Sequence, residues 1–168
     1  MGFKKTSELI AISFNVTETA ANTYTQDQIA LQLDVLNNEI FVVLAADLDC
    51  FTPDAIPGTN TNVGSAISST TQATLANLSG TNTIAVSQLD IRAAGFVDSG
   101  VGFSRAAQES YTGDLDYIAL IATNNFFVGI QGEANAGAKQ VNGRVWGYRA
   151  KADSATYAAL VQSEVLSA

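Results

Sequence analysis

Residues 31–48 read LQLDVLNNEIFVVLAADL, and residues 117–130 read YIALIATNNFFVGI. In both stretches an apolar run stops at an Asn-Asn pair, Asn37-Asn38 or Asn124-Asn125, and another apolar run follows at once. Asparagine adopts positive φ more readily than any residue except glycine, so an Asn-Asn pair suits the centre of a type I′ turn between antiparallel strands. The pattern therefore predicts two β-hairpins. Because the flanking runs are too apolar to face water on both sides, we expect a second layer of structure to cover each hairpin.

Alternation of apolar and polar residues, the period of a half-buried strand, predicts further strands along the chain. Residues 39–50 are instead apolar on both faces, which is typical of a central strand. Residues 51–69 contain both prolines and many small polar residues, and they predict a long loop. The remaining predicted strands are 10–17, 29–36, 70–78, 83–91 with a bulge near Ser87-Gln88, a glycine-rich strand around 96–103, and 140–150.

The C-terminal segment predicts a helix over 154–166, capped by Asp153 or Ser154. Tyr157, Leu160, Val161 and Val165 would share its apolar face. About eight or nine strands, with turn signals roughly every 8 to 12 residues and a closing helix, are typical of an all-β antiparallel β-sandwich, here a single jelly roll. The length favours one domain over residues 1–168.

The chain is acidic, with 16 Asp and Glu against 8 Lys and Arg and a net charge of −8. Because nucleic-acid binding depends on clustered basic side chains, we expect no direct contact with nucleic acid. The N-terminal MGFKKTSELIAISFNV alternates where a signal peptide needs an unbroken apolar core, so no export signal is visible. No apolar run approaches the roughly 20 residues of a membrane helix, and a soluble protein is expected.

The chain contains no histidine. Ser-His and Cys-His catalysis and His-bound zinc are therefore excluded, and we expect no enzyme activity. The single cysteine, Cys50, lies in the apolar phase of a strand and is interpreted as a small buried hydrophobe, since it has no partner for an internal disulfide.

Two Asp-Leu-Asp triplets hold the paired carboxylates of the chain: Asp47 with Asp49, and Asp114 with Asp116. Residues i and i+2 of a strand point the same way, so each pair offers oxygen ligands to a hard cation. These four residues are the candidate site for a structural calcium ion, and no other cofactor is expected. The alternative interpretation is that the carboxylates only mark strand ends and turns.

The strand at 140–150 carries the other candidate residues. Alternation sends Trp146 and Tyr148 to the same side, where they form either part of the core or a contact for a glycan or a partner protein. Arg144, Arg149 and Lys151 are the candidate interface residues, because they bring three of the eight basic residues of the chain to one strand.

Three segments resemble small jelly-roll virion proteins of marine viruses: EIFVVLAADLD at 39–49, TGDLDYIALIATNNFFVGIQG at 112–132, and GRVWGYRAKADSATYAALVQSE at 143–164. The resemblance implies a non-catalytic structural subunit that assembles with copies of itself and with other virion proteins. It also implies synthesis in the host cytoplasm and a final location in the virion. The acidic balance departs from coat proteins that hold nucleic acid with basic arms, which favours an outer capsid shell or decoration role.

Two other classes of function remain open. A carbohydrate-binding or adhesion module requires Trp146 or Tyr148 exposed beside acidic residues. A trimeric jelly roll or a filament subunit would differ from a shell protein in symmetry and not in sequence.

Overall fold

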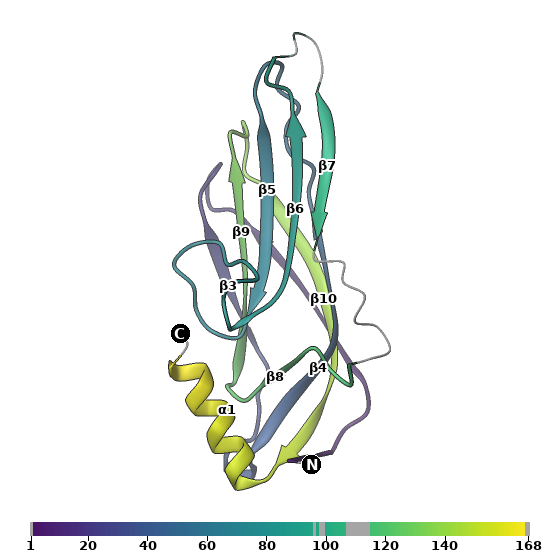
Figure 1. The fold of residues 1–168 in the computed structure, drawn as a ribbon, viewed down its shortest axis with the longest axis vertical. Coiled ribbons are helices and arrows are strands. Elements are labelled where there is room, and N and C mark those ends of the chain that lie inside the picture. The colour runs from purple at the N-terminus through teal and green to yellow at the C-terminus, as the bar shows by residue number, and fades with distance from the viewer. Residues whose placement is uncertain (1, 96, 98–99, 107–114, 167–168) are drawn as a thin grey trace.

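The structure is a computed structural model, and it describes residues 2–95, 97, 100–106 and 115–166. Within these ranges most of the chain lies in two five-stranded sheets that face each other, followed by one α-helix (Figure 1). The elements are β1 (Phe3–Lys5), β2 (Ile10–Thr17), β3 (Thr25–Ala30), the 3₁₀ turn η1 (Val35–Asn37), β4 (Glu39–Cys50), β5 (Thr61–Ser68), β6 (Thr83–Arg92), β7 (Val101–Ala106), β8 (Ala119–Ile121), β9 (Asn125–Glu133), β10 (Gln140–Ala152) and α1 (Ser154–Leu166).

The strand order is that of a jelly roll. Sheet A has the order β1-β10-β4-β8, with β2 also paired to β10, and sheet B has the order β3-β9-β5-β6-β7. The antiparallel pairs β2–β10, β3–β9, β4–β8 and β5–β6 are nested in sequence, and successive pairs alternate between the two sheets. The chain is thus one long hairpin rolled up across two layers. The predicted antiparallel β-sandwich with a C-terminal helix is confirmed.

The two Asn-Asn segments are not hairpin turns, so that prediction is wrong. β3 and β4 belong to different sheets, and so do β8 and β9. Among the four asparagines only Asn38 has positive φ, at 55°, where it caps η1, whereas a type I′ turn needs positive φ at both central residues. Both segments instead carry the chain from one sheet to the other. They lie side by side, since the Leu31 N–H donates to the Asn124 carbonyl at 2.7 Å.

The connections of the jelly roll gather at two ends. We call the end that holds residues 31–38 and 122–124 the corner end, and the end that holds residues 18–24, 51–60 and 134–139 the loop end. The start of α1 also lies at the corner end, which is the lower part of Figure 1. The β5–β6 connection leaves β5 on the same side, since Ser68 pairs with Phe127 near the start of β9.

The strands predicted at 10–17, 39–50 and 140–150 are confirmed, β10 continuing to Ala152. The predicted bulge near Ser87-Gln88 is wrong, because these two residues pair regularly with Ser65 and Gly64. The irregularity of β6 lies at Ile84 instead, because Ile67 pairs with Ala85 but Ser68 pairs with Thr83. A second register shift occurs in β4, where Trp146 pairs with Ala45 but Gly147 pairs with Val43. The extra residue lets Phe41 and Val43 before it, and Ala46 and Leu48 after it, face the same core between the sheets.

Residues 51–69 are only partly a loop, because β5 runs through their second half and pairs with both β6 and β9. Its small residues fit a crowded site: a Cβ added at Gly64 would lie 2.6 Å from Leu75 of the β5–β6 connection. Residues 70–78 form no strand, so the predicted hairpin with 83–91 is wrong, and β6 pairs with β5 instead. The composition of residues 51–69 did not indicate the central strand β5, because many of the residues buried there are small or polar.

The predicted helix is confirmed, and Asp153 caps it by accepting from the Thr156 N–H at 2.7 Å. α1 packs on the outer face of sheet A, where Tyr157, Leu160 and Val161 contact a second cluster that includes Ile40 and Val42. This third layer explains why β4 is apolar on both faces. Val165 was expected on the packed face, but it is exposed, and Glu164 is buried in its place. The helix in the described ranges has 13 residues, too few to cross a membrane.

Candidate interaction surfaces

The half of sheet A that α1 does not cover presents most of the residues that the sequence singled out. Asp47 and Asp49 lie exposed on one face of β4, as their spacing predicts. On the neighbouring strand β10, Arg144 is opposite Asp47. The Arg144 guanidinium stands 5.8 Å from the centre of the Trp146 ring, and its Nε donates to Ser13 Oγ at 3.0 Å. An aromatic ring, a cation and two carboxylates therefore share one outward face.

Asp47 and Asp49, two of the four predicted calcium ligands, lie on this face. Asp116 is exposed in the segment just before β8, which belongs to the same sheet as β4, and Asp114 lies outside the described residues. In the described part of the chain no group of three or more acidic, Cys or His side chains is arranged to hold a metal. Since calcium takes about six to eight oxygen ligands, Asp47 and Asp49 alone make an incomplete site. Calcium binding stays a prediction.

Trp146 and Tyr148 lie on the same side of β10, but their surroundings differ. Tyr148 packs into the cluster beneath α1, with Lys5 Nζ 5.2 Å from its ring centre. Trp146 is half-buried, and its neighbours across the sheet are Ala11 and Ala45. Their methyl side chains leave the indole the largest group on this part of the face.

The three candidate interface cations also separate. Arg144 and Lys151 are exposed. Arg149 is used within the chain: its guanidinium donates to the carbonyls of Leu31 at 2.6 Å and Gln32 at 3.1 Å, and forms an ion pair with Glu39 at 2.8 Å. Arg149 therefore holds the chain where it leaves β3 at the corner end.

Sequence reasoning did not identify a carboxylate that organises the loop end. Glu18 is 4% exposed, and its two oxygens accept from the N–H groups of Thr23 and Gly132 at 3.0 Å and of Lys139 at 2.9 Å. These donors come from three separate parts of the chain. A lone Glu after a strand of alternating residues carries no signal that would reveal such a role.

Asp54 joins the same end of the molecule. Lys139 Nζ lies 2.6 Å from Asp54 Oδ1, and the Ala136 N–H donates to Oδ2 at 2.8 Å. The hydrogen bond from Lys139, followed by that from the Ala136 backbone, holds the pKa of the Asp54 carboxyl below its usual value. The nearby Asn135 amide donates to the Asn62 carbonyl at 2.9 Å. The loop end is thus closed by polar contacts between connections far apart in sequence.

Cys50 is buried in the core, as expected, with its Sγ 2.9 Å from Ser65 Oγ. Burial raises the pKa of its thiol. A neutral, covered thiol is a poor nucleophile, so the position of Cys50 favours a packing role.

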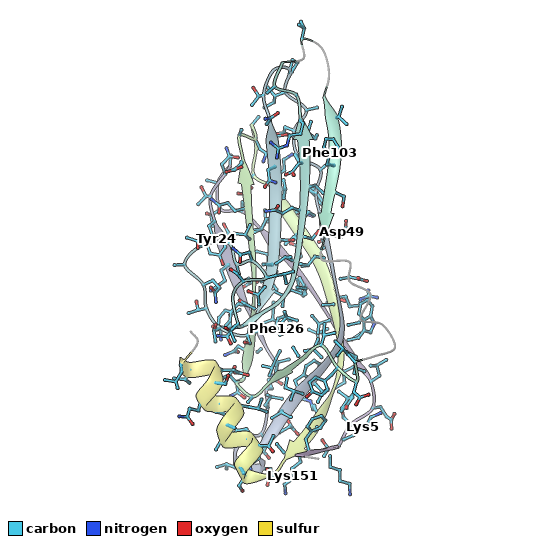
Figure 2. All side chains as sticks on the ribbon, viewed as in Figure 1. Lys5, Tyr24, Asp49, Phe103, Phe126 and Lys151 are labelled. Carbon is cyan, nitrogen blue, oxygen red and sulfur yellow. The ribbon has the colours of Figure 1, made fainter. Side chains whose placement is uncertain are left out.

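The outer strand of sheet B forms a second candidate surface. β7 pairs with β6 on one side, and no strand in the described ranges pairs with its other side. Val101 and Phe103 of β7 are 48% and 53% exposed. Figure 2 shows Phe103 on this outer strand, whereas Phe126 lies in the interior. An unpaired edge that carries exposed apolar side chains is a template for pairing with another chain.

Comparison with known proteins assigns no family to this chain. No family model matches it, and no curated protein matches it. A solved structure of Desmodium yellow mottle tymovirus is similar at 16% sequence identity and a TM-score of 0.31, over 84% of this chain and 87% of that chain.

Proposed function

We propose that this protein is a non-catalytic structural subunit that assembles with copies of itself in a viral capsid, as an outer shell or decoration protein. The observation that carries the proposal is the open edge of sheet B, where β7 exposes Val101 and Phe103 and no strand in the described ranges pairs with its outer side. Proteins whose edge strands do not serve association usually blunt them with Lys, Pro or a covering segment.

The topology and the composition support the same role. Jelly rolls build virion shells as well as lectin domains, and the rolled hairpin described above is of this type. Fold by itself does not determine function, so the role depends on the surface of the molecule. The acidic charge disfavours contact with the genome and fits a place on the outside of a particle.

Light scattering and negative-stain microscopy of the purified full chain test the proposal. We expect particles or closed oligomers that grow with protein concentration, and images that distinguish a shell from a trimer or a filament. A monomer that persists across protein concentration and salt would overturn it.

A carbohydrate-binding module is the second candidate, because Trp146 is half-buried on the same outward face as Asp47 and Asp49. Aromatic faces stack on sugars, and carboxylates accept from sugar hydroxyls. Trp146 is the single tryptophan of the chain, so its fluorescence reports directly on this face. Saturable quenching by a glycan, lost in Asp47→Asn, would favour this candidate, and a null glycan array would dismiss it.

A further inference from the structure

A small cavity at the corner end is lined by a buried carboxylate, and one of its two oxygens has no hydrogen-bond partner among the described residues. The cavity has a volume of about 200 Å³ and lies between α1, β8 and the β5–β6 connection. Glu164 lines it and is 5% exposed. Its Oε1 accepts from the Ala122 N–H at 2.8 Å, while no group in the described chain bonds to Oε2.

The electrostatics of the cavity favour a cation. A buried carboxylate without a positive partner is costly, and its desolvation outweighs what one neutral hydrogen bond returns. Glu164 also lies in the last turn of α1, where the helix dipole is negative and adds to its field. The side chains that line the cavity include no Lys or Arg; its polar members include Ser69, Asn82, Thr83 and Ser163.

The donor set discriminates among cations. Among the described residues that line the cavity, Glu164 is the one acidic residue. Calcium and magnesium sites use several carboxylate or carbonyl oxygens, so a hard metal ion is disfavoured. A cation that carries N–H donors suits one carboxylate surrounded by hydroxyl and amide groups. The volume is below the roughly 300 to 1,000 Å³ typical of sites for drug-sized ligands, and fits a single ammonium or guanidinium group.

We propose that the Glu164 cavity binds an alkylammonium or guanidinium group, supplied by a free small molecule or by a Lys or Arg side chain of a second copy of this chain. The Glu164 carboxylate keeps one oxygen on the Ala122 N–H and turns the other, which is covered in this structure, toward the ligand. This proposal does not depend on the capsid role, because a free cation would bind a monomer equally well.

Titration of the full chain with methylguanidinium, followed by backbone amide NMR, tests the cavity. We expect saturable shifts at Ala122 and Ser163 and a higher midpoint of thermal unfolding. Tetramethylammonium, a cation without N–H donors, should produce neither effect. Equal effects of the two cations, or no saturable shift, would overturn the proposal and would leave water as the occupant.

Variants separate the cavity from general charge. Glu164→Gln should reduce methylguanidinium affinity at least about tenfold, whereas Glu133→Gln, at an exposed position, should leave it unchanged. If Glu164→Gln fails to fold, the proposal is tested on the unmodified chain, by comparing the effects of methylguanidinium and tetramethylammonium. Dispersal of oligomers by methylguanidinium would identify the side chain of a second copy as the natural occupant, and binding without dispersal would identify a free ligand.

Discussion

Each end of the sandwich contains a buried carboxylate that accepts backbone hydrogen bonds. The two ends differ in how many of the carboxylate oxygens have a hydrogen-bond partner. At the loop end, Glu18 accepts three backbone hydrogen bonds through both of its oxygens. At the corner end, Glu164 accepts one, and its second oxygen has no partner in the described chain. A closed end contributes stability, whereas an end with a spare buried charge is suited to binding. The difference separates an end that contacts within the chain close from the end where we propose a ligand.

The largest expected effect is at the loop end. Glu18→Gln places an amide N–H₂ where the carboxylate accepted from backbone donors, so buried N–H groups lose their partner. We expect the free energy of unfolding in urea to fall by about 3 kcal/mol. Glu133→Gln, which changes charge equally at an exposed position, should change it by less than about 0.5 kcal/mol. Equal effects of both variants would show that Glu18 does not organise this end.

At the corner end, Arg149→Met removes the donors to Leu31 and Gln32 and leaves Glu39 without its ion-pair partner. We expect a loss of about 2 kcal/mol in urea unfolding, smaller than for Glu18 because the Arg149 side chain is 29% exposed. Lys151→Met, on the same strand but exposed, is the matched control. If Arg149→Met lowered the free energy of unfolding no more than Lys151→Met does, the contacts of Arg149 would not stabilise the corner end.

The twin Asn-Asn segments allow a test of the corner against the hairpin interpretation. Asn38 has positive φ, so Asn38→Ala should cost about 1 kcal/mol and Asn38→Gly less than about 0.5 kcal/mol. The φ of Asn125 is not positive, and Asn125→Ala should cost less than about 0.5 kcal/mol. Stability measurements that found both asparagines equally intolerant of alanine would support a type I′ turn and contradict the corner.

The smallest expected effect is a pH dependence at the loop end. The folded-state pKa of Asp54 lies below its unfolded value near 3.8, because Lys139 and the Ala136 N–H favour the carboxylate. Its contribution to stability is therefore present above about pH 3.8 and lost as the pH falls through the lower folded pKa. The difference in unfolding free energy between the wild type and Asp54→Asn should shrink below about pH 4. A difference that stays constant to pH 2 would refute the assignment.

Local pattern in the sequence predicted the elements better than their partners. The period at residues 10–17 and the apolar run at 39–50 identified β2 and β4 because side-chain alternation and burial are read directly from residue type. The prediction of two Asn-Asn hairpins was wrong because the residues of a turn do not reveal which sheet the next strand joins. β5 was missed because residues 61–68 include many small and polar residues. Their burial depends on contacts that the sequence does not show: Val63 and Ile67 join the core between the sheets, and Leu75 packs above Gly64.

For the candidate site too, the sequence predicted where residues lie on the strands but not what they contact. Spacing placed Asp47 and Asp49 on one face, and alternation placed Trp146 and Tyr148 on one side of β10. Spacing did not show that Tyr148 would be packed beneath α1 or that Arg149 would be used inside the chain. The role of Arg149 depends on a contact with Leu31, more than 100 positions away in the sequence, and the burial of Tyr148 depends on how α1 folds back onto sheet A.

Sedimentation velocity of the full chain tests the central claim, self-assembly through the open edge of sheet B, most directly. The wild type should sediment as oligomers or particles, and Phe103→Asp should weaken self-association at least about tenfold. Leu78→Asp is the matched control, because Leu78 is 54% exposed against 53% for Phe103 and lies away from β7 in sequence, on the β5–β6 connection. A monomeric wild type, or equal losses in both variants, would contradict the account.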